Sequence, residues 1–389
     1  MESSTESAGV HDVDGCCVQS LLEALRRVPD YRHKRGRRYE AATVLAILLL
    51  AKMSGEQTVS GSAHWARLRK EWLMGALGIE SLPCANTYGY VCAHLDVVEL
   101  NTVVREWLSQ ISPDRSADEL VHWAIDGKML RGSHRRTPEV VEGQEVLNVY
   151  AVETGGLQHC EMIESKGFEA ATAYDYIAQT DCSGVVITAD ALHTRPRFVR
   201  QIRKQHGHYI LIVKRNRPQL EAEIRKLFAL PPDPYFPVQS DQTVDVGHGR
   251  LTIRRLSTST ELNLALRDEW CDVAQVFLIE RYGTRDGKSY FDSVCGLTSL
   301  PPHRASPAQL LAWVRAHWHI ENRCHWRRDA TLREDACTVR HRLVTAILAV
   351  LNSLILAMFD FHNVTNARAA IRTIAANPQQ ALNLITQPL

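Results

Sequence analysis

The spacing of apolar residues changes from a helical to a strand period near residue 112, and a helical period returns near residue 304. In residues 16–112 apolar positions recur three to four residues apart, which predicts a group of helices. The most apolar run, 40–53, ends at Gly55 and is expected to be a buried core helix. Residues 1–15 have no periodic apolar face, so we expect them to be disordered.

The middle of the chain alternates short apolar runs with helical patterns. Strands are expected over 120–125, 146–152 and 157–163, with the turn residues Gly155-Gly156 between the last two. A helix over 169–179, a strand over 184–188, a helix over 195–205 and a strand over 208–213 follow. This order predicts a mixed sheet in which helices cross over between parallel strands.

Residues 214–303 have a strand-rich and irregular pattern, which predicts a β-rich insertion. A helix capped by Ser306-Pro307 then runs through Glu321, and a long apolar helix covers 341–359. We therefore expect an α/β core in two parts, 115–213 and 304–360, with a helical domain over 16–114 before it and a helical tail over 361–389.

Composition excludes several classes of protein. The 389 residues are 45% hydrophobic and 23% charged with a net charge of +1, which is typical of a globular chain of two or three domains. The ten cysteines form no C-x-x-C pair, which fits a reducing cytoplasm better than a disulfide framework. The apolar run 41–51 is far shorter than the roughly 20 residues that span a bilayer, so no membrane partner is expected.

Positive charge is concentrated locally. Residues 26–38 contain seven Lys or Arg and one acid, among them Arg35, Arg37 and Arg38. Residues 195–217, which begin with Arg195, contain eight Lys or Arg and no acid. Such segments are either solvated loops and helix faces or sites of phosphate contact, and the pattern alone leaves both open.

Three carboxylates stand where chemistry is expected. Asp126 and Asp190 each follow a predicted strand, and Glu321 lies in a predicted helix, 315–329, that is rich in Trp, His and Arg. Acids at the carboxyl ends of strands meet in the crevice where α/β sheets place their sites. Three converging acids favour Mg²⁺ or Mn²⁺, and two such ions about 4 Å apart can promote phosphoryl displacement. The alternatives are that the aspartates are turn or N-cap residues and that Glu321 pairs with Arg315 or Arg328.

Several neighbours are candidates for supporting roles. The cations expected to contact phosphate near the site or in the insertion are Lys128, Arg131, Lys214, Arg328 and Arg250. The histidines expected to lie around the metal ligands are His193, His317 and His325. Each has an ordinary structural alternative. Trp65, Trp72, Trp318 and Trp326 are interpreted as core residues rather than stacking surfaces.

Short motifs in a fixed order carry a family resemblance. They are Val28-Pro-Asp-Tyr-Arg32, Arg35-Gly-Arg-Arg38, Ala124-Ile-Asp-Gly-Lys-Met-Leu-Arg-Gly-Ser133, Thr188-Ala-Asp-Ala-Leu-His-Thr194, His208-Tyr-Ile-Leu-Ile-Val-Lys-Arg-Asn216, Gly247-His-Gly-Arg250 and His317-Trp-His-Ile-Glu-Asn322, then His325-Trp326, Asp329 and Glu334-Asp335. With these motifs, which cover residues 20–355, the sequence resembles bacterial insertion-sequence transposases of the DDE type. It is most similar to the H-repeat-associated group linked to Rhs elements.

The resemblance implies a ribonuclease-H-like core, a metal-binding triad of Asp126, Asp190 and Glu321, and two Mg²⁺ or Mn²⁺ ions. It also implies an N-terminal domain that contacts transposon-end DNA, and a DNA-bound homodimer at the nucleoid. The wider superfamily has Tyr, Arg and Lys around the glutamate, where this chain has Val314, His317 and Arg328. We therefore expect strand cleavage at transposon ends and transfer of the 3′-OH to target DNA. A DNA-binding protein that no longer cuts and a nuclease without strand transfer remain the alternatives.

Overall fold

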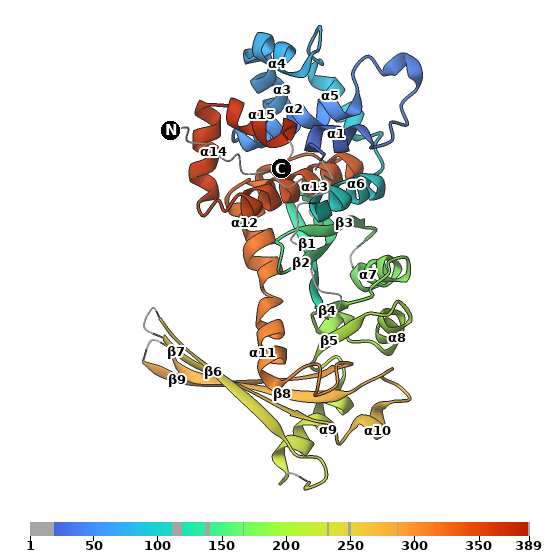
Figure 1. Cartoon of the computed structure of the whole chain (residues 1–389), viewed down its shortest axis with the longest axis vertical. Coiled ribbons are helices and arrows are strands. Elements are labelled where there is room, and N and C mark those ends of the chain that lie inside the picture. Colours follow the sequence, from blue (N-terminus) through green and yellow to red (C-terminus); the bar gives the residue numbers. More distant parts are fainter. Residues whose placement is uncertain are drawn as a thin grey trace, which may run out of the picture.

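The computed structural model describes residues 19–110, 119–136, 141–165, 167–231, 233–247, 250–285 and 287–387. The expected disordered segment, 1–15, lies outside this range. Helices from both ends of the chain gather at one end of the molecule, a mixed sheet runs through its middle, and two long hairpins project from the other end (Figure 1). The chain is therefore a mixed α/β protein with a helical N-terminal region.

The helical end combines N-terminal and C-terminal segments that share one apolar core. The central helix α2 is buried along its whole length, as its uninterrupted apolar run predicts. Among the helices predicted for residues 16–112, the stretch 59–77 forms two helices that are broken at Arg69. The bounds are α1 (Leu21–Arg26), α2 (Ala41–Met53), α3 (Val59–Leu68), α4 (Lys70–Leu77), α5 (Ala85–Cys92), α6 (Val97–Gln110), α13 (Arg342–Phe361), α14 (Ala367–Ala376) and α15 (Gln379–Thr386).

Helix α13 alone is long and apolar enough to cross a membrane among the described helices, with a mean hydropathy of 2.1. In the fold, 89% of its most apolar window is buried. It packs on β3, α6, α2 and α5, so its apolar composition is explained by its position inside the shared core.

One sheet in the described residues contains nine strands, in the order β3-β2-β1-β4-β5-β9-β8-β7-β6. β1, β2 and β3 are antiparallel, whereas β1, β4 and β5 are parallel, as the predicted crossovers require. The bounds are β1 (Val121–Arg136), β2 (Val141–Ala151), β3 (Leu157–Ile163), β4 (Val185–Ala189), β5 (His208–Val213), β6 (Gln239–Gly247), β7 (Arg250–Ser259), β8 (Gln275–Arg285) and β9 (Lys288–Thr298).

The insertion extends the same sheet, because β9 pairs with β5 through Ile210–Val213. Helix α9 (Pro218–Ala229), strand β6 and the short helix α10 (Asn263–Leu266) are insertion elements that the apolar pattern did not predict. All positions of β6 are exposed except one that is partly buried. This strand therefore lacks the alternation of apolar and polar residues that would have predicted it. The two hairpins β6–β7 and β8–β9 form the projecting arm (Figure 1).

Alternation of side chains divides the sheet into two faces. Ile125, Val185 and Ile187 pack in one core with α7 (Glu169–Ala178) and α8 (Pro196–Lys204). Ala124 and Val186 point the opposite way, toward the helices at residues 307–330. Because successive strand residues alternate, the even-numbered residues of β1 and β4 face this helical segment.

The segment that carries Glu321 is not the single regular helix that its sequence predicts. α11 (Pro307–Ala316) begins at the expected Ser306 cap, with a capping box to Gln309. A turn and a π-helical segment, Ile320–His325, precede α12 (Trp326–Ala330). The wider π turn is a common feature of functional helices. It leaves Glu321 exposed and Arg328 fully buried, whereas the single helix predicted over 315–329 would place these two side chains on neighbouring faces.

Candidate active site

Asp126 and Asp190 lie at equivalent positions of two paired parallel strands. The last residue pair of the β1–β4 ladder is Ile125 and Ala189, and each aspartate is the next residue in the chain. Asp126 is not at a strand end as predicted, because β1 continues to Arg136 in its pairing with β2. By strand alternation, both aspartates share the sheet face that carries the π-helical segment.

A pocket of about 510 Å³ joins the three predicted acids. Asp126 and Asp190 line it from the sheet, and Glu321 lines it from the π-helical segment. Lys214, which is exposed at the end of β5, and His317 also line it. Asp126 and Glu321, which are 195 positions apart in the sequence, thus meet in one pocket. The hypothesis of a carboxylate site requires such a meeting.

The electrostatics of this pocket come from excess negative charge. Burial, followed by the nearby carboxylates of Glu169, Asp190 and Glu321, raises the pKa of Asp126 to about 7. A carboxyl with a pKa this high is only partly ionised at neutral pH unless a cation compensates its neighbours. The pocket is therefore a site at which a cation would be bound favourably.

The donor set has the chemistry of a divalent metal site, because the three carboxylates that line the pocket supply only hard oxygen ligands. The geometry is open: across the described residues, no three His, Cys, Asp or Glu side chains are close enough together to hold a metal ion. Asp126, Asp190 and Glu321 therefore fit a metal ion by charge and ligand type, and the ion would have to draw their side chains together.

A chain of polar contacts leads from Asp126 into the core. Arg328 Nη1 donates to Asn148 Oδ1 over 2.9 Å, which orients the Asn148 amide nitrogen toward His325 Nε2, 3.1 Å away. Because His325 Nε2 accepts a hydrogen bond from the Asn148 amide, the proton of the neutral His325 ring is on Nδ1. This Nδ1 lies 3.5 Å from Asp126 Oδ2. Burial, followed by Arg328 and Lys128, holds the pKa of His325 well below its usual value, so this ring is neutral.

A second contact fixes the π-helical segment on the sheet. Thr188 Oγ1 lies 2.6 Å from His122 Nε2 and 3.0 Å from His317 Nδ1. Burial lowers the pKa of His317 to about 4 and that of His122 to about 3, so both rings are neutral at physiological pH. His317 thus ties the helix beside Glu321 to the strand that ends at Asp190.

The comparisons with known proteins agree with this geometry. The family described as "Transposase DDE domain" matches residues 123–358, and the family described as "DDE_Tnp_1-associated" matches residues 22–108. The first match covers 236 of 389 residues and spans all three acids (358 − 123 + 1 = 236). The chain belongs to the DDE transposase family. The resemblance drawn from the sequence motifs is confirmed.

Relatives of this DDE transposase family member are distant. "Uncharacterized protein in dhlA 3'region" of Xanthobacter autotrophicus is 25% identical over 72% of this chain and 93% of its own length. "Putative transposase YncI" of Escherichia coli O157:H7 is 22% identical over 85% of each chain. "H repeat-associated putative transposase YhhI" of Escherichia coli strain K12 is 22% identical over 83% of this chain and 85% of its own length.

A fourth carboxylate, Glu169, which the sequence reasoning missed, lies near Asp126 but does not line the transposase pocket. Glu169 begins α7, and its carboxylate lies so close to Gly127 that a Cβ there would be 2.6 Å from Oε2. Its Oε1 is 2.9 Å from Nε2 of the buried His193, which lies 3.9 Å from Asp190 Oδ1. An acid at the first turn of a helix usually serves the helix dipole, so nothing in the sequence separated it from that role.

Two predicted phosphate contacts are structural instead. Arg328 is fully buried, with its guanidinium bonded to Glu334 and Asn148, so it has no exposed N–H for a phosphate. Lys128 is 5% exposed and lies 2.7 Å from Asp329 Oδ1 and 3.6 Å from Glu334 Oε2. Placing either cation against DNA would break a buried ion pair, so both predictions are corrected.

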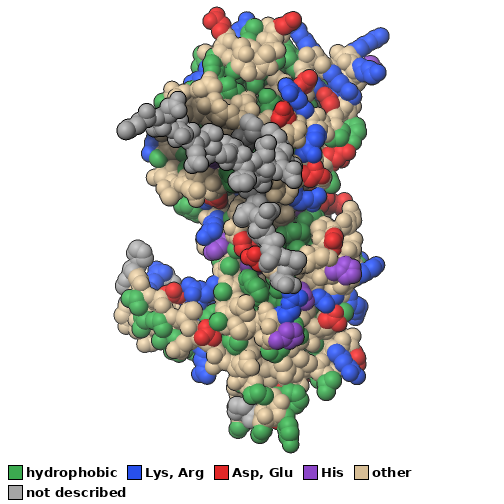
Figure 2. Space-filling view, in the orientation of Figure 1, with side chains coloured by type: hydrophobic (Ala, Val, Ile, Leu, Met, Phe, Trp, Pro, Cys, Tyr) green, Lys and Arg blue, Asp and Glu red, His purple; other side chains and the backbone are tan. Residues whose placement is uncertain are grey.

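The transposase pocket obtains its cations from other elements. Arg254 on β7 and Arg281 on β8 are paired across the two strands, and Arg315 reaches in from α11. Asp245 bonds both Arg254 and Arg315, and Asp292 bonds Arg281, which reduces the repulsion between the arginines. Figure 2 shows Lys and Arg side chains gathered on the projecting arm beside the body. The irregular pattern of the insertion gave no signal for Arg254 and Arg281, and Arg315 was considered only as an ion-pair partner of Glu321.

The remaining predicted cations lie away from the pocket. Arg131 is 77% exposed and 3.8 Å from Asp335. Arg195 and Arg250 are exposed at the starts of α8 and β7, and His248 is outside the described residues. Arg35, Arg37 and Arg38 are exposed in the segment between α1 and α2, as predicted, whereas Arg32 in that segment is buried and bonded to Asp30. Trp318 and Trp326 are 56% and 60% exposed, which contradicts their interpretation as core residues.

Proposed function

We propose that this transposase cuts DNA strands at transposon ends and transfers the resulting 3′-OH to target DNA in a metal-dependent reaction. The observation that carries the proposal is the single pocket lined by Asp126, Asp190 and Glu321, with Lys214 and three arginines around it. The three acids can bind metal ions, and the flanking Lys and Arg side chains can bind a polyanion beside those ions. This combination suits phosphoryl transfer between nucleic acids.

The proposed ligands are Mg²⁺ or Mn²⁺, two per site, held by the carboxylates of Asp126, Asp190 and Glu321. Bound ions would stabilise the negative charge that develops on the reacting phosphate. The chain's own residues orient the ligands: the proton on His325 Nδ1 faces Asp126, and Glu169 with His193 lies beside Asp126 and Asp190. Lys214, Arg254 and Arg281 would hold the scissile strand over the acids.

The strand order β3-β2-β1-β4-β5 supports a ribonuclease-H-like core. In it, β1 pairs antiparallel with β2 on one side and parallel with β4 on the other. We propose the core over 115–213 and 304–360, the insertion over 214–303, and the helical region 16–114 as the part that contacts terminal repeats. The exposed Arg35, Arg37 and Arg38 are the cations proposed for that contact. Pairing two transposon ends suggests a homodimer on DNA, at the nucleoid in the cytoplasm.

The test uses the DNA that flanks the gene on both sides as substrate for the full-length protein. We expect cleavage in Mg²⁺ or Mn²⁺, and no cleavage by Asp126→Asn, Asp190→Asn or Glu321→Gln, with DNA binding largely retained. Normal cleavage by any of these variants would contradict the proposed site. Specific end binding without cleavage would identify a DNA-binding protein, and cleavage without strand transfer from pre-cut ends would identify a nuclease.

A further inference from the structure

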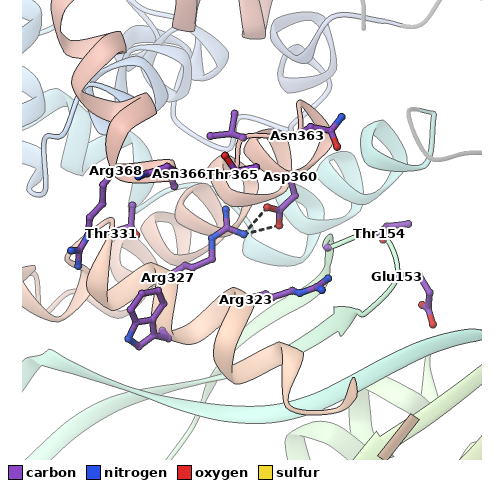
Figure 3. A pocket seen from close by; sticks show the side chains of 14 residues that line it. Glu153, Thr154, Arg323, Arg327, Thr331, Asp360, Asn363, Thr365, Asn366 and Arg368 are labelled. Carbon is purple, nitrogen blue, oxygen red and sulfur yellow. Dashed lines mark hydrogen bonds and ion pairs between the residues drawn. The ribbon is translucent and has the colours of Figure 1, made fainter. Parts of the chain in front are cut away.

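A second cleft lies on another side of the helical segment that carries Glu321. It measures about 780 Å³ and is lined by the segment Arg323–Thr331, by the turn between β2 and β3, and by the connection from α13 to α14. Its walls carry three arginines, Arg323, Arg327 and Arg368 (Figure 3). None of these residues lines the pocket of the three acids.

The arginines of this cleft differ in their partners. Arg327 Nη1 lies 2.6 and 2.8 Å from the two carboxylate oxygens of Asp360, so that pair is neutral (Figure 3). Within the described residues, the Arg368 guanidinium donates to the backbone carbonyl of Ala330 over 2.8 Å and to no acid. Arg323 is exposed and has no hydrogen bond or ion pair within the described part of the chain. Two guanidinium groups are therefore left without an acid.

The other acid on the wall, Glu153, accepts the backbone N–H of His122, 3.1 Å away. The three arginines outnumber the two acids, Asp360 and Glu153, so the lining keeps a net positive charge. The remaining polar lining consists of the neutral side chains of Thr154, Thr331, Asn363, Thr365 and Asn366. Trp326 lies at the cleft with 60% of its surface exposed. Net positive charge, neutral hydrogen-bonding groups and an exposed indole together match a nucleotide chain, whose phosphates and bases need these partners.

We propose that this cleft binds the phosphate backbone of a DNA strand outside the catalytic pocket, with Arg323 and Arg368 as the phosphate contacts. The inference rests on the proposed function, because it takes DNA as the substrate. Arg327 holds the cleft together through Asp360 rather than binding phosphate. Trp326 provides the flat surface against which one base of the strand packs.

The test is binding of the full-length protein to a labelled mixed-sequence duplex and to a labelled single strand, measured by fluorescence anisotropy over a range of salt concentrations. Each lost phosphate contact should reduce the slope of log K against log salt by about 0.9 on duplex DNA, or about eightfold in affinity at 0.1 M salt. We expect this reduction in slope for Arg323→Ala and for Arg368→Ala, and a reduction in slope twice as large when both residues are changed. Trp326→Ala should weaken binding to the single strand and leave the slope unchanged.

Arg267→Ala is the matched control, because Arg267 is an exposed arginine (67%) in the insertion, on another element. If the cleft variants bind with the slope and affinity of this control, the proposal is overturned. It is also overturned if inorganic phosphate raises the melting temperature of the wild type but not of Arg323→Ala while DNA binding is unchanged, because the cleft then takes a small anion. A wild type that binds DNA through Arg323 but never cuts would contradict the proposed function and leave this site standing.

Discussion

Arg328 Nη2 lies 2.9 Å from Glu334 Oε1 in a fully buried ion pair that stands behind the pocket of acids. Burial alone would raise the pKa of Glu334, but Arg328 and Lys128 outweigh it and the pKa is lowered overall. Asn352 donates to the same carboxylate over 2.9 Å, and Asn148 accepts from the same guanidinium. The pair is thus hydrogen-bonded on both sides and linked through His325 to Asp126.

We predict that Arg328→Met destabilises the protein by about 3–5 kcal/mol, because it leaves the buried Glu334 carboxylate without its main cation partner, with only Lys128 3.6 Å away. The double variant Arg328→Met with Glu334→Leu should recover a large part of that loss, since it removes the poorly paired carboxylate while Lys128 keeps its ion pair with Asp329. Urea unfolding of the wild type and the variants measures both values. A loss below about 1 kcal/mol for the single change would show that the pair does not hold this part of the core.

The free energy of unfolding should also depend on pH because Asp126 lies among other carboxylates. The pKa of Asp126 is raised to about 7, so between roughly pH 4 and 7 the folded protein keeps a proton that the unfolded chain releases. The stability that this proton provides is present below pH 4 and is lost as pH rises through about 7. We therefore predict that Asp126→Asn is more stable than the wild type at pH 8, by about 1–2 kcal/mol, because the side chain is about a third exposed.

The measurement is thermal unfolding with a chelator at pH 5 and pH 8. The gap between variant and wild type should be small at the lower pH and open at the higher one. Asp268→Asn removes an acid whose side chain is 95% exposed and should leave stability unchanged at both pH values. Added Mg²⁺ should raise the melting temperature of the wild type more than that of Asp126→Asn. Equal curves for both proteins at pH 8 would show that Asp126 is not repelled by its neighbours.

The sequence predicted the parts of this fold that depend on local periodicity. β3 and β5 have the bounds that their apolar runs predicted, and the cap at Ser306 is present. Asp126, Asp190 and Glu321 meet in one pocket because parallel strands place the residues that follow them side by side. A repeated apolar pattern thus determines where a backbone goes, and hence which strand-end residues can meet.

The sequence could not predict which cations are free. Arg328 and Arg323 stand five residues apart in one helical stretch, yet the first is buried against Glu334 and the second is exposed. The difference follows from the π-helical turn at Ile320–His325 and from an acid that approaches from a later loop. Strand β6 was missed for a similar reason, because nearly every residue in it faces solvent and no alternation remains.

The last prediction concerns Glu169, whose carboxylate contributes to the pKa of Asp126 and contacts His193 over 2.9 Å. Glu169→Gln removes the charge and keeps an oxygen that accepts from His193 Nε2. If the carboxylate helps to hold the metal ions, Mg²⁺ affinity should fall by about 10–100-fold. Cleavage should fall at low Mg²⁺ and recover at high Mg²⁺, and its pH profile should shift to lower pH as the pKa of Asp126 falls. His193→Gln is the matched change, since it keeps the acid but loses the ring that orients it. A purely structural role for Glu169 would lower the melting temperature and leave the Mg²⁺ dependence of both the melting temperature and cleavage unchanged.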